Sequence, residues 1–189
     1  MPSGNRTMCA PPMDTQSLLP ALLFAATKIQ PPRPRRARLQ RPALEAGLVA
    51  ALLQSRVVVV QAPAGYGKTS LLASLAGGLP AGTALAWVSL DEDDDEQRLC
   101  ACLCAALEPF DLPWRVAPEA LAALADSEGA GRARALAELV NALAGADAAH
   151  GVIVLDDLHR VASDGVLELL EGLVERLPAQ WSVLLSSRV

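Results

Sequence analysis

Four apolar segments of the chain predict buried β-strands. The first, residues 57–60, is a run of four valines with no alternation of apolar and polar positions. Such a run is typical of a strand buried on both faces of a parallel sheet. The other three predicted strands span residues 84–90, 151–155 and 181–185.

Between the strands, apolar residues recur at the spacing of a helix. Pro42 suits the first position of a helix, and it is followed by an apolar stripe made of Leu44, Leu48, Ala51 and Leu52. Further helices are predicted from about residue 68 to residue 77 and over 97–107, 118–125, 130–143 and 165–177. Alternating strands and helices predict an α/β fold with right-handed crossovers. Residues 1–27 lack this periodicity and are predicted to form a flexible N-terminal tail, so the folded domain spans 28–189.

The composition narrows the class of protein. Hydrophobic residues make up 52% of the 189-residue chain and charged residues 20%, as in a folded globular domain. A net charge of −5 offers no electrostatic footprint for nucleic acid over the chain as a whole. No apolar run is long enough to cross a membrane. Residues 18–26 do not read as a signal peptide, because Pro20 interrupts the run and Asp14 precedes it, so we expect a cytoplasmic protein.

Several polar or reactive segments receive a structural interpretation. The Pro- and Arg-rich segment 31–36 fits a charged linker better than a basic arm for nucleic acid, since no aromatic residues interleave with the arginines. The acidic run 91–96 is predicted to be a solvated face that complements a helix N-terminus. His159 is predicted to make structural hydrogen bonds, and Trp87 to lie in the core. The cysteines lack the paired spacing of a zinc site and are predicted to be small buried hydrophobes: Cys9, Cys100, Cys102 and Cys104.

The loop after the first strand matches a phosphate-binding P-loop. Residues 62–69 read APAGYGKT, which departs from the strict pattern only in having Ala62 at its first glycine. Gly65 and Gly67 allow the backbone to turn its N–H groups toward phosphate oxygens. The Lys68 ammonium is expected to reach the β- and γ-phosphates, and the Thr69 hydroxyl to bind Mg²⁺. The nucleotide-binding residues predicted in this loop are Ala62, Pro63, Ala64, Gly65, Tyr66, Gly67, Lys68, Thr69 and Ser70.

Acidic residues end the third predicted strand, in the sequence VIVLDDLH. Asp156 is expected at the carboxyl edge of the sheet, where it would hold Mg²⁺ through water. Asp157 is then placed to polarise the attacking water, with a capping or salt-bridge role as the alternative. After the fourth strand, Arg188 is read equally well as a sensor of the γ-phosphate or as a surface arginine near the chain end.

Taken together, these segments resemble the ATPase domain of LuxR-type large ATP-binding transcriptional regulators, the maltose-activator-like signal-transduction ATPases. The resemblance covers about residues 27–188 and rests on the segments TKIQPP (27–32), RPAL (41–44), APAGYGKT (62–69), WVSLDE (87–92), LDDLH (155–159) and SSR (186–188). It implies a P-loop NTPase three-layer sandwich with a mainly parallel sheet, in which the fourth strand lies between the first and third. It also implies ATP and Mg²⁺ as cofactors, with Lys68 and Thr69 as the phosphate and magnesium residues, Asp156 as the Walker B acid and Arg188 as a sensor.

The resemblance further implies a mode of action. Family members switch between an ATP-bound and an ADP-bound state. They self-associate in the ATP state and hydrolyse ATP slowly. The segment 39–41, ending at Arg41, is expected to border the adenine.

Family members continue for many hundreds of residues, through parts that include a DNA-reading element. We therefore expect a fragment with four core strands, an incomplete sheet, and no DNA binding by this chain alone. Residues 57–60 would then line an exposed apolar edge. Two other functions stay open, a P-loop enzyme such as a small-molecule kinase and a degenerate module without activity, but the intact Lys68, Thr69 and Asp156 favour a nucleotide switch.

Overall fold

The computed structural model describes residues 24–32, 41–127 and 129–189. Its four strands are β1 (Val57–Gln61), β2 (Ala84–Ser89), β3 (Gly151–Asp156) and β4 (Trp181–Ser187). Its α-helices are α1 (Pro42–Gln54), α2 (Lys68–Leu72), α3 (Glu96–Leu107), α4 (Pro118–Ala125), α5 (Ala130–Ala144) and α6 (Asp164–Arg176). The 3-10 helices are η1 (Ala26–Ile29), η2 (Leu75–Gly77), η3 (Glu108–Phe110) and η4 (Leu158–Arg160). The fold is α/β, as predicted.

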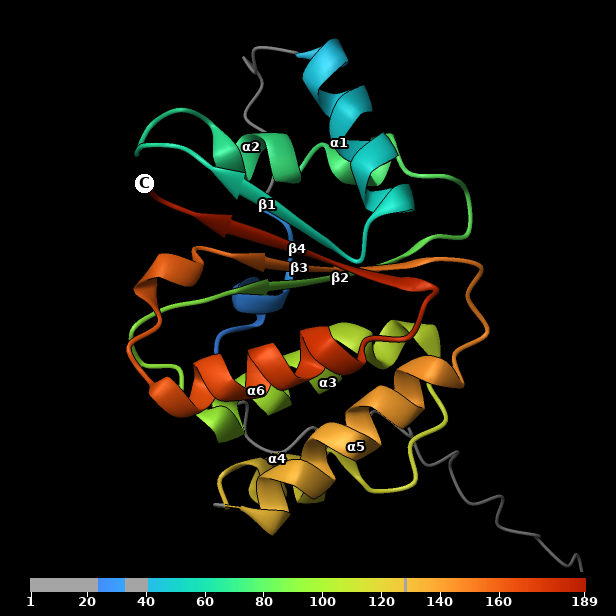
Figure 1. Cartoon of the computed structure of the whole chain (residues 1–189), viewed down its shortest axis with the longest axis vertical. Coiled ribbons are helices and arrows are strands. Elements are labelled where there is room, and N and C mark those ends of the chain that lie inside the picture. The colour runs from blue at the N-terminus through green and yellow to red at the C-terminus, as the bar shows by residue number, and fades with distance from the viewer. Residues whose placement is uncertain (1–23, 33–40, 128) are drawn as a thin grey trace, which may run out of the picture.

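All four strands are parallel and form one sheet in the order β1-β4-β3-β2. The fourth strand therefore lies between the first and third, as the resemblance implied. Figure 1 shows the sheet edge-on, with its four strands running in the same direction. Parallel strands end at a common edge, so the loops that follow β1, β2, β3 and β4 meet on one side of the molecule.

Helices cover both faces of the sheet, which gives the predicted three layers (Figure 1). On one face, α1 and α2 pack over Val152, Val154 and Leu184. On the other face, α3 and α6 lie against the sheet, and α4 and α5 pack outside them. Both faces of β3 are fully buried, because a central strand presents alternate side chains to the two helical layers.

The prediction that the first strand is buried on both faces is wrong. β1 lies at the edge of the sheet, and Val59 is 58% exposed. Val58 and Val60 pack against the core under α1 and α2, while Val57 and Val59 point to the opposite face. Four consecutive valines indicate a strand but do not tell which of its faces neighbouring elements cover. The expectation that residues 57–60 line an exposed apolar edge is confirmed for the place of β1 at the edge and for Val59, whereas the other three valines are half-buried.

The helix predicted from the P-loop to residue 77 is shorter than expected. α2 ends at Leu72, and the chain continues through Ser74 into the separate 3-10 helix η2. The Ser74 hydroxyl donates a hydrogen bond to the carbonyl of Leu71, 2.5 Å away, and so competes with the helical pattern at this point.

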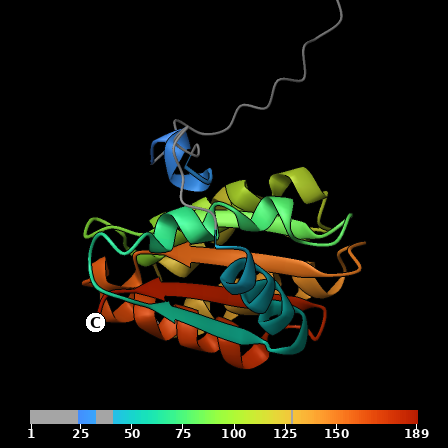
Figure 2. The same cartoon turned by 90° about the horizontal axis from the view of Figure 1, so that it is seen from above.

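The described part of the chain begins at Phe24, whose side chain lies in the core. The 3-10 helix η1 follows and packs against β2 and α3, at the edge of the sheet opposite β1. Figure 2 shows this short segment, in blue, beside the main body of the fold. Most of the predicted tail, residues 1–23, lies outside the described residues. None of the helices described is long and apolar enough to cross a membrane.

Candidate functional site

The loop between β1 and α2 has two glycines in the left-handed region. Gly65 has φ of +81° and Gly67 has φ of +82°, a conformation that L side chains rarely adopt. Gly67 is also the residue that caps the start of α2. These two turns let the chain leave a strand and enter a helix within a few residues. Tyr66, between them, is 63% exposed at the tip of the loop.

Lys68 lies in the first turn of α2 and folds back over the loop. Its Nζ donates hydrogen bonds to the carbonyl of Ala62, at 2.6 Å, and to the carbonyl of Pro63, at 3.2 Å. The ammonium is therefore held inside the curve of the loop, with one of its three donors left over. The next residue, Thr69, is half-buried, and Ser70 is exposed.

Asp156 ends β3 and is 2% exposed. Its Oδ1 accepts a close hydrogen bond from Ser186 Oγ and a second from the Asp157 N–H, at 3.1 Å. Ser186 is aligned with Val60 on β1, so it bridges the strand of the glycine loop and the strand of Asp156. Since β1 and β3 are separated only by β4, they lie about 10 Å apart at this edge. Ser186 was not identified as a site residue from the sequence, although it lies in the SSR segment 186–188, because its bond to Asp156 depends on which strands are neighbours in the sheet.

Asp157 adopts a left-handed backbone with φ of +61°, which turns its side chain away from the line of β3. Its Oδ1 lies 3.9 Å from Nδ1 of His159. Both ring nitrogens of His159 are buried, and neither has a hydrogen-bond partner in the described part of the chain. The prediction that His159 makes structural hydrogen bonds is therefore not met.

Arg188 follows β4 at the same edge. Its carbonyl accepts a hydrogen bond from Gln61 Nε2, at 3.2 Å, and Gln61 is aligned with Ser187 in the sheet. The backbone of Arg188 thus lies beside the start of the glycine loop, and its side chain is exposed. Figure 1 shows the C-terminal end next to the loop that leads into α2.

The acidic segment after β2 is only partly the solvated face that the sequence predicted. Asp95 caps α3, as expected, by accepting the Arg98 N–H at 2.7 Å. Asp94, however, is 3% exposed and accepts a hydrogen bond from Lys28 Nζ at 2.8 Å. Lys28 also contacts Asp91 Oδ2, at 2.7 Å. Burial by itself raises the pKa of Asp91, but Lys28, Arg98 and the Asp93 N–H outweigh it and lower that pKa below 3.8.

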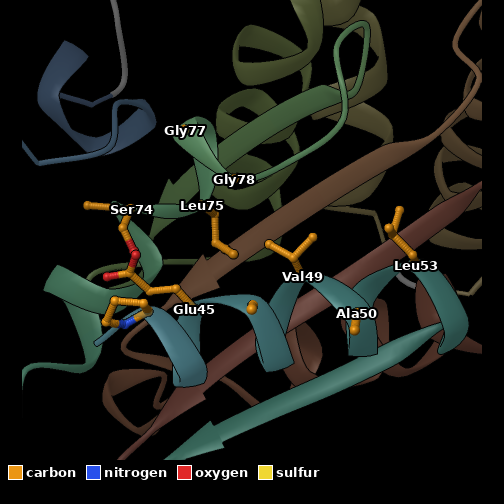
Figure 3. Close-up of a pocket in the computed structure, with 11 residues that line it drawn as sticks. Glu45, Val49, Ala50, Leu53, Ser74, Leu75, Gly77 and Gly78 are labelled. Carbon is orange, nitrogen blue, oxygen red and sulfur yellow. The ribbon is translucent and has the colours of Figure 1, made fainter. Parts of the chain in front are cut away.

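A groove of about 770 Å³ lies between α1 and the segment around η2. Its lining is mainly apolar and includes Pro42, Val49, Leu53 and Leu75, with Glu45 at one end (Figure 3). The groove contains no residue of the 62–69 loop. Arg41, at the start of α1, directly precedes Pro42 in the chain. Residues 39 and 40, predicted with Arg41 to border an adenine, lie outside the described residues.

The cysteines of α3 are free and buried, as predicted. Burial raises the pKa of Cys102 to about 12. A hydrogen bond with Cys100, and burial, raise the pKa of Cys104. The Cys102 and Cys104 thiols therefore stay protonated near neutral pH, and all three buried cysteines serve as packing groups. Cys9 lies outside the described residues.

Comparison with known families agrees with the P-loop NTPase fold that the strand order and the glycine loop indicate. A model of the AAA ATPase domain matches residues 38–186, which is most of the chain. The chain belongs to the AAA ATPase domain family. This domain is a nucleotide-binding module, and the matched region contains the glycine loop, Asp156 and Ser186.

One relative of this AAA ATPase domain is the HTH-type transcriptional regulator MalT of Serratia proteamaculans (strain 568). It is 32% identical over 159 residues, which cover 82% of the present chain. The chain spans only 17% of the length of that relative.

Proposed function

We propose that this chain binds ATP with Mg²⁺ at the carboxyl edge of its sheet and acts as a nucleotide switch in a transcriptional regulator. Membership of the AAA ATPase domain family supports nucleotide binding. The similarity to MalT, named as a transcriptional regulator, supports the regulatory role. The observation that carries the proposal is the loop between β1 and α2, with Gly65 and Gly67 at positive φ and the Lys68 ammonium held within its curve.

In this proposal the triphosphate lies along residues 62–70. The backbone N–H groups of the loop donate to phosphate oxygens, and Lys68 exchanges its bonds to the carbonyls of Ala62 and Pro63 for charged phosphate oxygens. Because α2 has only five residues, its dipole is small, and the loop amides and Lys68 supply most of the recognition. Arg41 borders the base.

The oxygen atoms at the edge of the sheet suit Mg²⁺, which prefers hard oxygen ligands and retains bound water. The Thr69 hydroxyl and the Asp156 carboxylate are the proposed ligands. In the described residues, the hydrogen bonds of the Asp156 side chain are all made by Oδ1, so Oδ2 can accept a metal-bound water. Ser186 holds the carboxylate in this orientation. When bound, the metal would neutralise phosphate charge.

Hydrolysis in this proposal is slow or absent. Asp157 is the proposed base that accepts a proton from the attacking water, and Arg188 senses the γ-phosphate from the end of β4. The ATP state then promotes self-association through this domain, and hydrolysis ends that state. A cytoplasmic location follows from the requirement for ATP.

The test is a titration with a fluorescent ATP analogue in the presence of Mg²⁺. Replacing Lys68 by Ala removes a charged hydrogen-bond donor, and we expect the affinity to fall at least about tenfold. Arg134→Ala is the control, because it removes one positive charge from the exposed surface of α5. Equal affinity of the wild type and Lys68→Ala would contradict the proposal.

A further inference from the structure

Lys28 is a buried lysine outside the proposed nucleotide site. Lys28 is 7% exposed, and the sequence contains only one other lysine, Lys68. It belongs to η1, which packs against the edge strand β2 and against α3. A buried ammonium is costly unless it is paired, and Lys28 meets two carboxylates, those of Asp91 and Asp94.

Asp94 depends on this lysine for its charge balance. Its side chain is fully buried, and Oδ2 accepts from Lys28 Nζ at 2.8 Å. The other cation nearby is Arg98, whose Nε lies 3.6 Å from Asp94 Oδ1, and neither of those two atoms has a hydrogen-bond partner in the described part of the chain. In the described residues, the direct hydrogen bond from a cation to Asp94 therefore comes from a segment that is more than sixty residues away in the sequence.

The same carboxylate shapes the loop after β2. Asp94 Oδ2 also accepts the backbone N–H of Asp91, at 2.8 Å. The preceding residue, Leu90, donates its N–H to the carbonyl of Asp156, at 2.8 Å. Ser89 is aligned with Asp156 in the sheet. Hydrogen bonds thus link Lys28 to Asp94 and Asp94 to the backbone of Asp91. The adjoining residue, Leu90, is bonded in turn to the backbone of Asp156, the residue proposed to hold Mg²⁺.

We propose that Lys28 is a positioning residue, and that η1 is a strap across the β2 edge that holds Asp156 in place for Mg²⁺. This inference rests on the proposed function of the edge. Lys28 fixes Asp94, Asp94 fixes the turn at Asp91, and that turn fixes the backbone beside Asp156. Detaching η1 releases the end of β2 and lowers the contribution of Mg²⁺ to nucleotide affinity. The glycine loop lies beyond β4 on the other side of Asp156, so metal-free nucleotide binding is preserved.

The quantity to measure is the ratio of ATP-analogue affinity with Mg²⁺ to the affinity with EDTA. In Lys28→Met this ratio should fall about fivefold, while the affinity in EDTA stays at the wild-type value. A purely structural loss of folded protein would reduce both affinities together and leave the ratio unchanged. Thermal melts followed by circular dichroism establish that each variant is folded.

Two further variants keep the test decisive. In Lys28→Met with Asp94→Asn the buried charge is removed with its partner, and the amide oxygen can still accept the Asp91 N–H. We expect this variant to fold even where Lys28→Met alone does not, because no unpaired buried carboxylate is left. The ratio should fall in it as well. Arg132→Met removes a cation that contacts Glu96 at 3.0 Å and Glu168 at 2.6 Å, and it should leave the ratio unchanged.

The outcomes separate the two proposals. If the folded double variant kept the wild-type affinity ratio, the strap proposal would be overturned and the proposed function would stand. The same would follow if the ratio fell equally in Arg132→Met. Failure of the wild-type chain to bind the analogue under either condition would overturn the proposed function, and the strap with it.

Discussion

Close contacts at single residues determine which positions of this fold tolerate a side chain. Gly151 begins β3 directly against the indole of Trp181, and an added Cβ would lie 2.3 Å from the ring. The ring cannot retreat easily, because Trp181 is fully buried and its Nε1 donates a hydrogen bond to the carbonyl of Leu143, at 2.9 Å. Glycine is needed here because space is lacking, whereas Gly65 and Gly67 have space but require an unusual φ.

We expect Gly151→Ala to lower the free energy of unfolding by about 1–3 kcal/mol, since it overpacks a rigid core contact. Gly47→Ala is the matched control. Gly47 lies within α1, where an added methyl group would meet no heavy atom within 4 Å, and the substitution should raise stability by up to about 1 kcal/mol through helix propensity. Urea denaturation measures both changes. Equal stability of the two variants would contradict the packing argument.

At the scale of elements, the loop between β2 and α3 combines several functions in five acidic residues, 91–95. Asp95 caps α3, while Asp91 and Asp94 bind the buried Lys28 of η1. The loop therefore joins the N-terminal segment to the edge of the sheet. Because the pKa of Asp91 is lowered in the folded state, its ionised form stabilises the fold at pH values above 3.8. That stabilisation is lost as the pH falls below 3.8 and through the lowered pKa.

This linkage predicts that Asp91→Asn flattens the acid side of the stability profile. In the wild type, the free energy of unfolding should decrease as the pH falls below 3.8. In Asp91→Asn this decrease should be smaller, with a lower stability at neutral pH. Urea denaturation at a series of pH values provides the measurement. Glu171→Gln, an equal change of charge on the exposed surface of α6, should retain the wild-type slope.

The whole molecule has two different sheet edges. At one edge, η1 packs beside β2. At the other, β1 pairs with β4 on one side only within the residues that the structure describes, and Val59 is 58% exposed. An unpaired edge with apolar side chains is a template for strand addition, so β1 is the place where two copies of the chain would associate nonspecifically.

We expect Val59→Lys to raise the concentration at which the chain self-associates, as measured by sedimentation velocity. Its stability should stay within about 0.5 kcal/mol of the wild type, because Val59 is largely exposed. Leu167→Lys makes the same change of charge on α6, where Leu167 is 43% exposed. If both variants changed association equally, the edge of β1 would not be responsible.

The sequence by itself determined the elements and the position of the candidate site. Alternating apolar runs and helical stripes predicted the four strands and most helix bounds, with α4 matching residues 118–125. The glycines and Lys68 in the 62–69 loop, and the acid at Asp156, marked the carboxyl edge. These features are readable because strand, helix and turn preferences depend on nearby residues.

The tertiary structure alone decided which distant groups meet. No local pattern indicates that Lys28 pairs with Asp94 or that Ser186 holds Asp156. Each of these contacts depends on how the strands are ordered and on which helices cover them. The sequence does not tell whether a given charged residue, serine or valine lies in solvent or in the core. Its burial depends on the packing of elements far apart in the chain.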